Sequence, residues 1–436
     1  MLESDNECPD SEVRIILRPH LYELRKVDTT SFPQPTASIE ASHVSIKTVL
    51  LAWELGGGIG HVTRLARLAG RLQPANLRLV AAVKHPEAAA VLAARGIEIV
   101  AAPRWPSASI SLERIAKTSS ATMGDILATA GLADTEGLRQ LLCAWDDLFS
   151  RLKPDLVVAN LAPAAAIVAR GRIPLLQIGD GYTLPPDGVD RFPLLHAMSD
   201  PGDETDTLAV LNGVLRSRGE LPFENLPQIF SGDARMVFTF PLLDPYAAHR
   251  SDPLHGPLVD HAPVAADSNS RAIFAYLSRG YPLHPEIPDA FLGCAPKLRI
   301  HAPELSDQQA RTLAQAGAVV EREPVAPAQA LASSSLVIHL GGSGLAAEAL
   351  MAGIPQLILS MQVEQWLTGS ALQRAGLGRL VAAYDPAARI APQIDAMLED
   401  TGMARRAVDA GQEYRDLYRR SDGPAIFEHT ASKLLG

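Results

Sequence analysis

Short apolar runs alternate with segments of helical hydrophobic spacing along most of the chain. Six runs in the first half are predicted as strands, at residues 48–53, 77–83, 97–101, 155–160, 175–178 and 236–240. These runs are continuously apolar rather than alternating, which is typical of parallel strands that helices cover on both faces. The predicted fold class of this half is therefore α/β.

The second half repeats the pattern after a segment rich in Pro, Asp and His. Its five predicted strands are residues 272–277, 297–301, 318–320, 336–339 and 356–359. Two helices, at about 402–418 and 424–435, end the chain. The predicted organisation is an N-terminal extension (1–46), a first domain (47–240), a linker (241–270), a second domain (271–402) and C-terminal helices (403–436).

Composition agrees with a globular protein of two or three domains, since 436 residues are 47% hydrophobic. The formal net charge of −10 argues against a nucleic-acid partner, which needs a basic surface. The three cysteines are scattered without metal-ligand spacing, and no signal peptide or membrane span is visible. We therefore expect a cytoplasmic protein without a metal site.

A glycine-rich turn follows the apolar run 336–340 in the second half. Gly341, Gly342 and Gly344 allow the backbone to turn tightly and to approach a ligand without a Cβ atom in the way. The free N–H groups and the dipole of the helix that follows favour an anion, typically phosphate. Glu348, one turn into this helix, can accept two hydrogen bonds from sugar hydroxyls. The arrangement suits a nucleoside diphosphate.

This segment resembles the nucleotide-sugar signature of GT-B glycosyltransferases, in particular the UDP- and dTDP-sugar transferases of plants and bacteria. The shared features are the glycine turn, the Glu, an Ala-x-x-x-Gly-x-Pro stretch and an acidic-Gln pair. The resemblance implies two doubly wound Rossmann-like domains with an interdomain cleft. It also implies that Gly341, Gly342, Ser343 and Gly344 hold the diphosphate, that Glu348 binds the ribose, and that Glu364 and Gln365 hold the donor sugar.

Two positions depart from the family pattern. The family's phosphate-binding His falls on Leu340, and its Ser or Thr after the last glycine falls on Leu345. His339 is one place early, and because a one-residue slip flips a strand side chain, we do not expect it to substitute. Diphosphate binding should then depend on backbone amides or on another cation.

Further donor contacts are implied by position. Ser278 and Arg279 follow the first strand of the second half, at the place of the family's second phosphate loop. Arg279 could donate to the diphosphate, and an exposed surface arginine is the alternative. Val325 lies where the family contacts the base through backbone groups.

The loop from Glu54 to His61 directly follows the first predicted strand. Ligands of open α/β sheets bind at the carboxyl ends of strands, so this loop should face the cleft. It resembles the family's Gly-His stretch, in which the His is the general base on the acceptor. A His with a pKa near 6.5 can take the proton of a hydroxyl during attack. Alternatively, His61 caps or fills space at a helix start.

The family's Asp that orients this His is replaced by Asn160, at the end of the fourth strand. An amide can orient the ring but cannot offset the charge of an imidazolium. Either the base is weaker, or Glu54 or Asp180 supplies the carboxylate. Glu54 could instead be satisfied by the N–H groups of its own loop.

Together these features predict an inverting, metal-independent, hexosyltransferase-type enzyme with no cofactor beyond a UDP- or dTDP-sugar as co-substrate. The loops 103–120 and 182–206 are proline-bearing and mostly uncharged, which favours an apolar small-molecule or lipid acceptor. Arg64, Arg67 and Arg71 share one helix face, for which a solvated surface is favoured over peripheral membrane contact. The alternatives are a nucleotide-sugar epimerase or hydrolase of the same fold and a non-catalytic relative that binds a nucleotide-sugar.

Overall fold

The computed structural model describes most of the chain from Ile46 onward. The described residues are 46–57, 59–73, 76–106, 120–197, 199–267, 270–277, 286–382 and 387–436. The predicted N-terminal extension, apart from Ile46, lies outside them, as do Ser278 and Arg279. Within the described part, no helix is both long and apolar enough to cross a membrane.

The first half forms a parallel six-stranded sheet with the order β3-β2-β1-β4-β5-β6. Its strands are β1 (Thr48–Trp53), β2 (Arg78–Val83), β3 (Glu98–Ala101), β4 (Leu156–Asn160), β5 (Leu175–Gly179) and β6 (Ala234–Val237). The last strand was predicted to begin two residues and to end three residues later than it does. Phe240 is apolar for another reason, because it packs with Ala346 and Leu350 of the second half.

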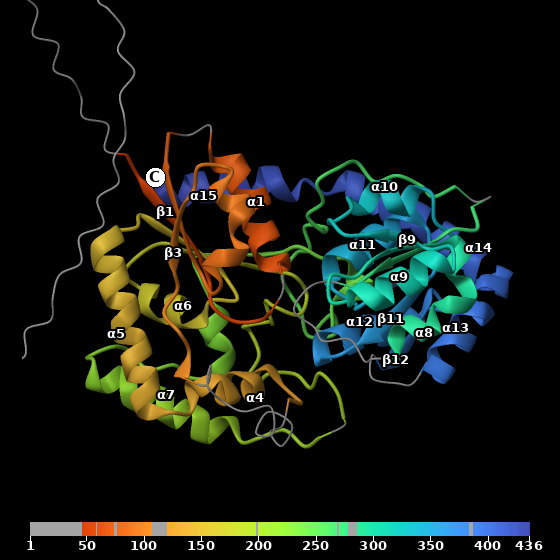
Figure 1. Cartoon of the computed structure of the whole chain (residues 1–436). Helices are drawn as coiled ribbons and strands as arrows, with labels where there is room; N and C mark the ends of the chain where they lie inside the picture. Colours follow the sequence, from red (N-terminus) through yellow and green to blue (C-terminus); the bar gives the residue numbers. More distant parts are fainter. Residues whose placement is uncertain are drawn as a thin grey trace, which may run out of the picture. The chain divides into compact units, whose positions relative to one another are not determined.

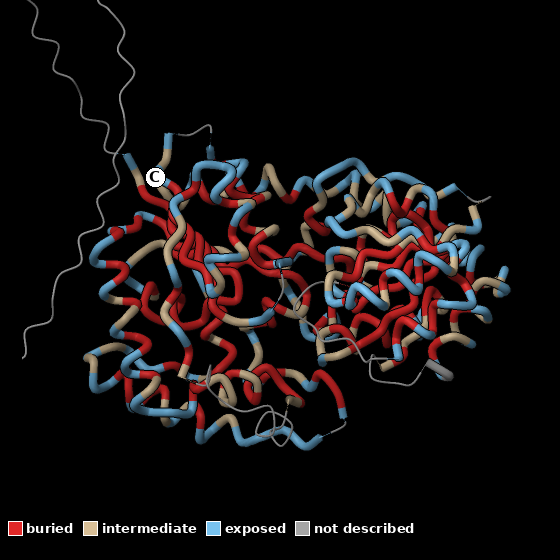
Figure 2. Tube along the Cα trace, in the orientation of Figure 1, coloured by how far each residue is buried: buried red, intermediate tan, exposed pale blue. Residues whose placement is uncertain are grey.

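Helices cover both faces of this sheet, as the continuous apolar strands predict. Leu50 and Ala52 of β1 point into one core, whereas Val49 and Leu51 point into the other. The residues of both cores are buried, and the interior of this half is coloured as buried in Figure 2. The helices of this half are α1 (Gly60–Leu72), α2 (Ala90–Ala93), α4 (Met123–Leu127), α5 (Thr135–Leu152), α6 (Pro163–Ala169) and α7 (Glu204–Ser217).

The second half repeats the arrangement in a sheet with the order β12-β11-β10-β7-β8-β9. Its strands are β7 (Ile273–Tyr276), β8 (Leu298–His301), β9 (Val319–Glu321), β10 (Leu336–His339), β11 (Gln356–Ser360) and β12 (Gly378–Ala382). The strand β12 was not predicted, since it is an edge strand whose apolar run is interrupted by Arg379. The helices are α8 (Ile287–Ala290), α9 (Asp307–Gln315), α10 (Pro327–Ala332), α11 (Ser343–Ala352), α12 (Val363–Arg374) and α13 (Ala387–Glu399).

The two C-terminal helices connect the halves. Helix α14 (Thr401–Arg420) packs on α11, and α15 (Gly423–Leu435) lies beside α1 (Figure 1). Phe427 and Ala431 of α15 are fully buried in the core formed by α1 and β1. The last helix thus packs against the first half, whereas α14 packs against the second.

Candidate donor and catalytic site

The glycine turn joins β10 to α11 and has one obligatory glycine. Gly341 has a φ of +94°, and a Cβ atom there would lie 2.8 Å from Ile358 Cγ2 and 3.0 Å from the backbone oxygen of Gln365. A Cβ atom at Gly342 or Gly344 would meet nothing within 4 Å. Gly341 is thus required by the protein's own packing, whereas Gly342 and Gly344 leave the backbone at the start of α11 open to approach.

His339 supports this turn from behind. Its Nδ1 atom accepts a hydrogen bond from the N–H of Gly341 (3.2 Å), so the proton lies on Nε2, which is 2.9 Å from Gln356 Oε1. Burial lowers the pKa of His339 to about 4, so the ring is neutral. It therefore brings no charge to an anion. Leu340, at the family's histidine position, is buried in the core of the second half.

The turn and the loop after β1 line the same pocket, which has a volume of about 200 Å³. Residues of both halves line it, and they include His61, Arg64, Asp180, Gly342, Ser343, Gly344, Glu364 and Gln365. All of them lie just after the carboxyl end of a strand or in the helix that follows it. The structure thus brings the predicted base together with five of the predicted donor-binding residues, Gly342, Ser343, Gly344, Glu364 and Gln365.

His61 lies in the first turn of α1 and is buried. Its ring stacks on Trp53, with centroids 5.1 Å apart and an interplanar angle of 13°. A Cβ atom at Gly56 would lie 2.5 Å from His61 Nε2, so only glycine fits against this edge of the ring. Among the described residues, His61 Nδ1 has no hydrogen-bond partner. Burial, helped by the positive charge of Arg64, lowers the pKa of His61 to about 3, so the ring is unprotonated at neutral pH.

Asn160 contacts the backbone of His61 and the side chain of Arg64. Its Nδ2 atom donates to the backbone oxygen of His61 (3.2 Å), and its Oδ1 atom accepts from Arg64 Nη1 (3.1 Å). The amide therefore fixes the start of α1 and the guanidinium beside it.

Glu54 is satisfied away from the pocket. Its carboxylate accepts hydrogen bonds from Trp105 Nε1 (2.7 Å) and from the N–H groups of Ala164 (3.0 Å) and Ala165 (2.6 Å). The last two donors belong to the first turn of α6. The alternative that N–H groups of its own loop satisfy Glu54 is therefore wrong, because the N–H donors come from α6. Burial raises the pKa of Glu54 to about 7. These bonds make it a structural cap of α6 rather than a partner of His61.

Of the two carboxylates proposed as partners of His61, Glu54 and Asp180, Asp180 is the one that lines the pocket. Oδ1 accepts hydrogen bonds from the N–H and the hydroxyl of Thr183, both at 2.8 Å. Oδ2 accepts from Arg64 Nη2 (2.6 Å) and from Ser343 Oγ (2.7 Å). Burial alone would raise the pKa of Asp180, but Arg64 and the hydroxyl and amide donors hold it well below its usual range. Asp180 is therefore ionised and joins residues of both halves.

Glu364 and Gln365 lie in the first turn of α12. Gln365 Oε1 accepts a hydrogen bond from the N–H of Met361 (2.8 Å), which closes the turn after β11. Burial, with the nearby charge of Asp180, raises the pKa of Glu364 to about 8. At neutral pH most of the Glu364 carboxyl is therefore protonated and can both donate and accept hydrogen bonds.

A second pocket of about 150 Å³ adjoins the first, and Arg64, Ser343 and Gly344 line both. Glu348 lines the second pocket one turn into α11, and burial raises the pKa of its carboxyl. Val325 is partly buried against the cluster that contains Phe274 and lines neither pocket.

The arginines of α1 do not form the solvated face that was favoured. The Arg64 side chain is only 11% exposed, and Arg67 forms an ion pair with Asp260 (2.6 Å) beside the second pocket. Arg71 alone is exposed. The sequence did contain a signal that Arg64 lies in the pocket. Arg64 is one turn into a helix that follows the carboxyl end of a strand, where ligands of open α/β sheets bind.

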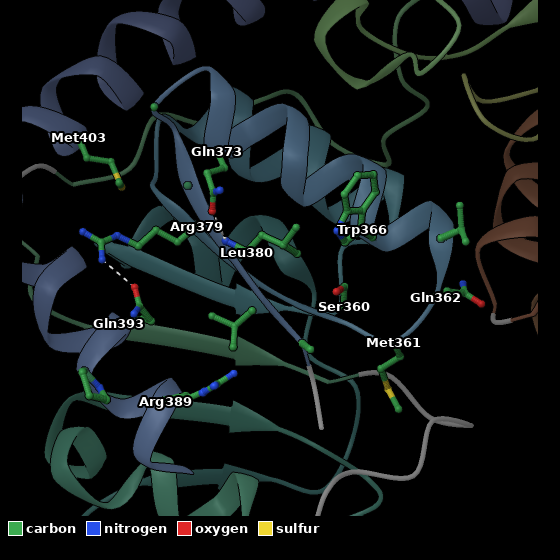
Figure 3. Close-up of a pocket in the computed structure, with 16 residues that line it drawn as sticks. Ser360, Met361, Gln362, Trp366, Gln373, Arg379, Leu380, Arg389, Gln393 and Met403 are labelled. Carbon is green, nitrogen blue, oxygen red and sulfur yellow. Dashed lines mark hydrogen bonds between the residues drawn. The ribbon is translucent and has the colours of Figure 1, made fainter. Parts of the chain in front are cut away.

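A further pocket, with a volume of about 1200 Å³, lies elsewhere in the second half. It runs along the edge strand β12, with Trp366 and Gln362 at one end and Met403 at the other (Figure 3). Arg379 Nη1 donates to Gln393 Oε1 (2.7 Å) within it. It contains neither His61 nor Asp180 nor Glu364, so we assign the chemistry to the smaller pockets.

Searches with the sequence find no matching protein-family model and no matching curated protein. Solved structures do match. CalG4, the calicheamicin glycosyltransferase, is 18% identical with a TM-score of 0.63, and the match covers 90% of this chain and 98% of that one. The glycosyltransferase of kitacinnamycin is 16% identical with a TM-score of 0.60, covering 90% and 100%. VinC, in complex with dTDP, is 15% identical with a TM-score of 0.58, covering 88% and 100%.

These matches extend over nearly the whole length of both partners in each pair. At such low identity they establish the fold, which is the two-domain α/β architecture of GT-B glycosyltransferases. The fold class predicted from the glycine turn and the two series of strands is thus confirmed.

Gly56→Ala tests whether the packing of His61 depends on a glycine at this position. We expect it to lower the free energy of unfolding by about 1–2 kcal/mol or more, because Gly56 has a φ of +83° and its new Cβ would meet the imidazole. Gly60→Ala is the control, since a Cβ there meets nothing within 4 Å. Urea denaturation followed by tryptophan fluorescence measures both. Equal effects of the two substitutions would contradict the described packing.

The ionisation of His61 can be measured directly. Because burial and Arg64 lower its pKa to about 3, the ring should remain neutral as the pH falls from 8 to 5. NMR spectra of protein labelled at the histidine rings, with His61→Gln to assign the signal, report this titration. A midpoint near the ordinary value of about 6.5 would show that the ring is not buried as described.

Proposed function

We propose that this protein is an inverting, metal-independent glycosyltransferase. It moves a sugar from a UDP- or dTDP-sugar to a hydroxyl group of an apolar small-molecule or lipid acceptor. The observation that carries the proposal is the shared pocket, in which a neutral, buried His61 lies with the open N-terminus of α11 and with Glu364. The GT-B fold supports the same reading.

The reaction follows from what these groups can do. His61 takes the proton of the acceptor hydroxyl while the oxygen of that hydroxyl attacks the anomeric carbon of the donor sugar. The bond between the anomeric carbon and the diphosphate breaks in the same step. A single displacement inverts the anomeric configuration. Negative charge develops on the leaving diphosphate, where the N–H groups of Gly342 to Gly344 and the dipole of α11 stabilise it.

The ionised Asp180 has a place in this scheme. His61 becomes an imidazolium as it takes the proton, and burial makes that charge costly. The negative charge of Asp180 raises the pKa of His61, opposing the effect of burial. Asp180 is therefore the better candidate for the offsetting carboxylate, since Glu54 is used at α6.

The remaining polar groups fit the donor. Glu364, mostly protonated at neutral pH, and Gln365 lie where the sugar would be held, and Glu348 can accept hydrogen bonds from ribose hydroxyls. A dTDP complex of VinC, a protein of the same fold, supports a nucleotide of this kind. The loop at 182–206, with Leu194 57% exposed, supports an apolar acceptor.

The proposal is tested by turnover of UDP- and dTDP-sugars with and without a pool of acceptor alcohols. His61→Ala should lower acceptor-dependent release of nucleoside diphosphate by about 10²–10⁴-fold, because a positioned base contributes that much. Calorimetry should show nearly unchanged affinity for the nucleoside diphosphate. His85→Ala is the control, since His85 is half-exposed and lines neither pocket.

Other outcomes separate the alternatives. Activity of His61→Ala within a few-fold of wild type would contradict the role of His61 as base. Turnover that needs no acceptor would favour an epimerase or hydrolase of the same fold. Binding of a nucleotide-sugar without turnover by the wild type would favour a non-catalytic relative.

A further inference from the structure

Arg64 lines the pocket into which the open N-terminus of α11 also faces. It is the single Lys or Arg among the described residues that line the first pocket, and it lines the second pocket as well. Its guanidinium is held by two different acceptors, Asn160 Oδ1 at 3.1 Å and Asp180 Oδ2 at 2.6 Å. The side chain is 11% exposed, so its charge acts in surroundings where water screens it weakly.

Arg67 and His339, two other basic residues that line these pockets, are bonded within the protein. Arg67 bonds Asp260 through both Nε and Nη2, at 2.8 and 2.6 Å. His339 is neutral and bonded to Gln356 and Gly341. Leu340 supplies no polar group. Among the described residues that line the two pockets, Arg64 is thus the one Lys or Arg that is not tied to an exposed carboxylate.

The carboxylate of Asp180 engages the same donors that a phosphate oxygen would engage. One oxygen, Oδ2, accepts from the Arg64 guanidinium and from the hydroxyl of Ser343, the first residue of α11. A guanidinium and a hydroxyl at a helix N-terminus are typical phosphate ligands. The Asp180 side chain is 4% exposed. Its bonds to Arg64 and Ser343 therefore lie within the pocket rather than at the surface.

We propose that Arg64 binds the diphosphate of the donor together with the N-terminus of α11, and that Asp180 competes with the diphosphate for Arg64 and Ser343. This inference rests on the proposed function, because it identifies the anion as a nucleoside diphosphate. When the diphosphate binds, Arg64 and Ser343 pass from Asp180 Oδ2 to phosphate oxygens. Thr183 continues to bond Asp180 Oδ1, so the carboxylate stays in place. When the product leaves, Asp180 takes both donors back.

The competition explains two features together. The family's phosphate-binding histidine is absent at Leu340, and Arg64 supplies the missing donor from the opposite half of the molecule. The ionised Asp180 then keeps this strong cation from holding the product too firmly, because each donor regained by Asp180 is lost by the diphosphate. A purely structural Arg64–Asp180 ion pair would instead affect folding stability without distinguishing a diphosphate from a nucleoside.

Calorimetric titration with UDP and dTDP, and separately with uridine and thymidine, tests the first part. Arg64→Gln should weaken binding of the diphosphates by roughly ten- to a hundredfold, the range of a charge-assisted hydrogen bond, and change nucleoside binding little. Arg71→Gln is the matched control, since it removes the same charge from an exposed position on the same helix. Thermal denaturation checks that each variant is folded.

Asp180→Asn tests the competition. It removes the negative charge that holds Arg64 and should tighten diphosphate binding by roughly tenfold, with little change for the nucleosides. Arg64→Lys serves if Arg64→Gln does not fold. It keeps the charge but loses the planar fork, so we expect diphosphate affinity between wild type and the loss expected for Arg64→Gln.

The results that would overturn the inference are distinct. Equal loss of diphosphate and nucleoside affinity in Arg64→Gln, or wild-type affinity in Arg64→Lys and Arg64→Gln alike, would remove Arg64 from the diphosphate site. Weaker diphosphate binding by Asp180→Asn would show that Asp180 supports Arg64 rather than competing for it. If the wild type binds none of the nucleotides, the proposed function fails and this inference fails with it.

Discussion

The left-handed backbone at Gly341 is the constraint on which the site depends. Ile358 and the backbone of Gln365 leave no room for a side chain at this residue, so β10 must turn sharply before α11 begins. The neutral His339 holds the N–H of Gly341 from behind. This turn directs the open N–H groups of α11 into the pocket, and it places Gln365 and Glu364 beside them.

The second determinant is the buried charge of Asp180. Its two oxygens accept four hydrogen bonds, from Thr183, Arg64 and Ser343, and these bonds keep it ionised despite burial. The same charge raises the pKa values of His61 and Glu364. One carboxylate therefore influences the proposed base, the proposed sugar-binding acid and the proposed diphosphate ligand.

The sequence predicted most of the fold because strands buried on both faces must be apolar along their length. It missed β12, where Arg379 interrupts the edge strand, and it placed β6 too late because Phe240 is apolar for interdomain packing. The glycine turn and His61 were found by local pattern. The local pattern did not reveal the position of Arg64 or the bonding of Glu54 to α6. Both depend on residues about a hundred positions away in the sequence.

Hydrogen exchange at the start of α11 tests the central claim most directly, since the claim is that these backbone amides bind a diphosphate. With saturating UDP or dTDP, the amides of residues 342–345 should exchange more slowly, because phosphate oxygens accept their hydrogen bonds. Uridine or thymidine alone should protect them much less. Binding of the diphosphate without added protection at these amides would contradict the account.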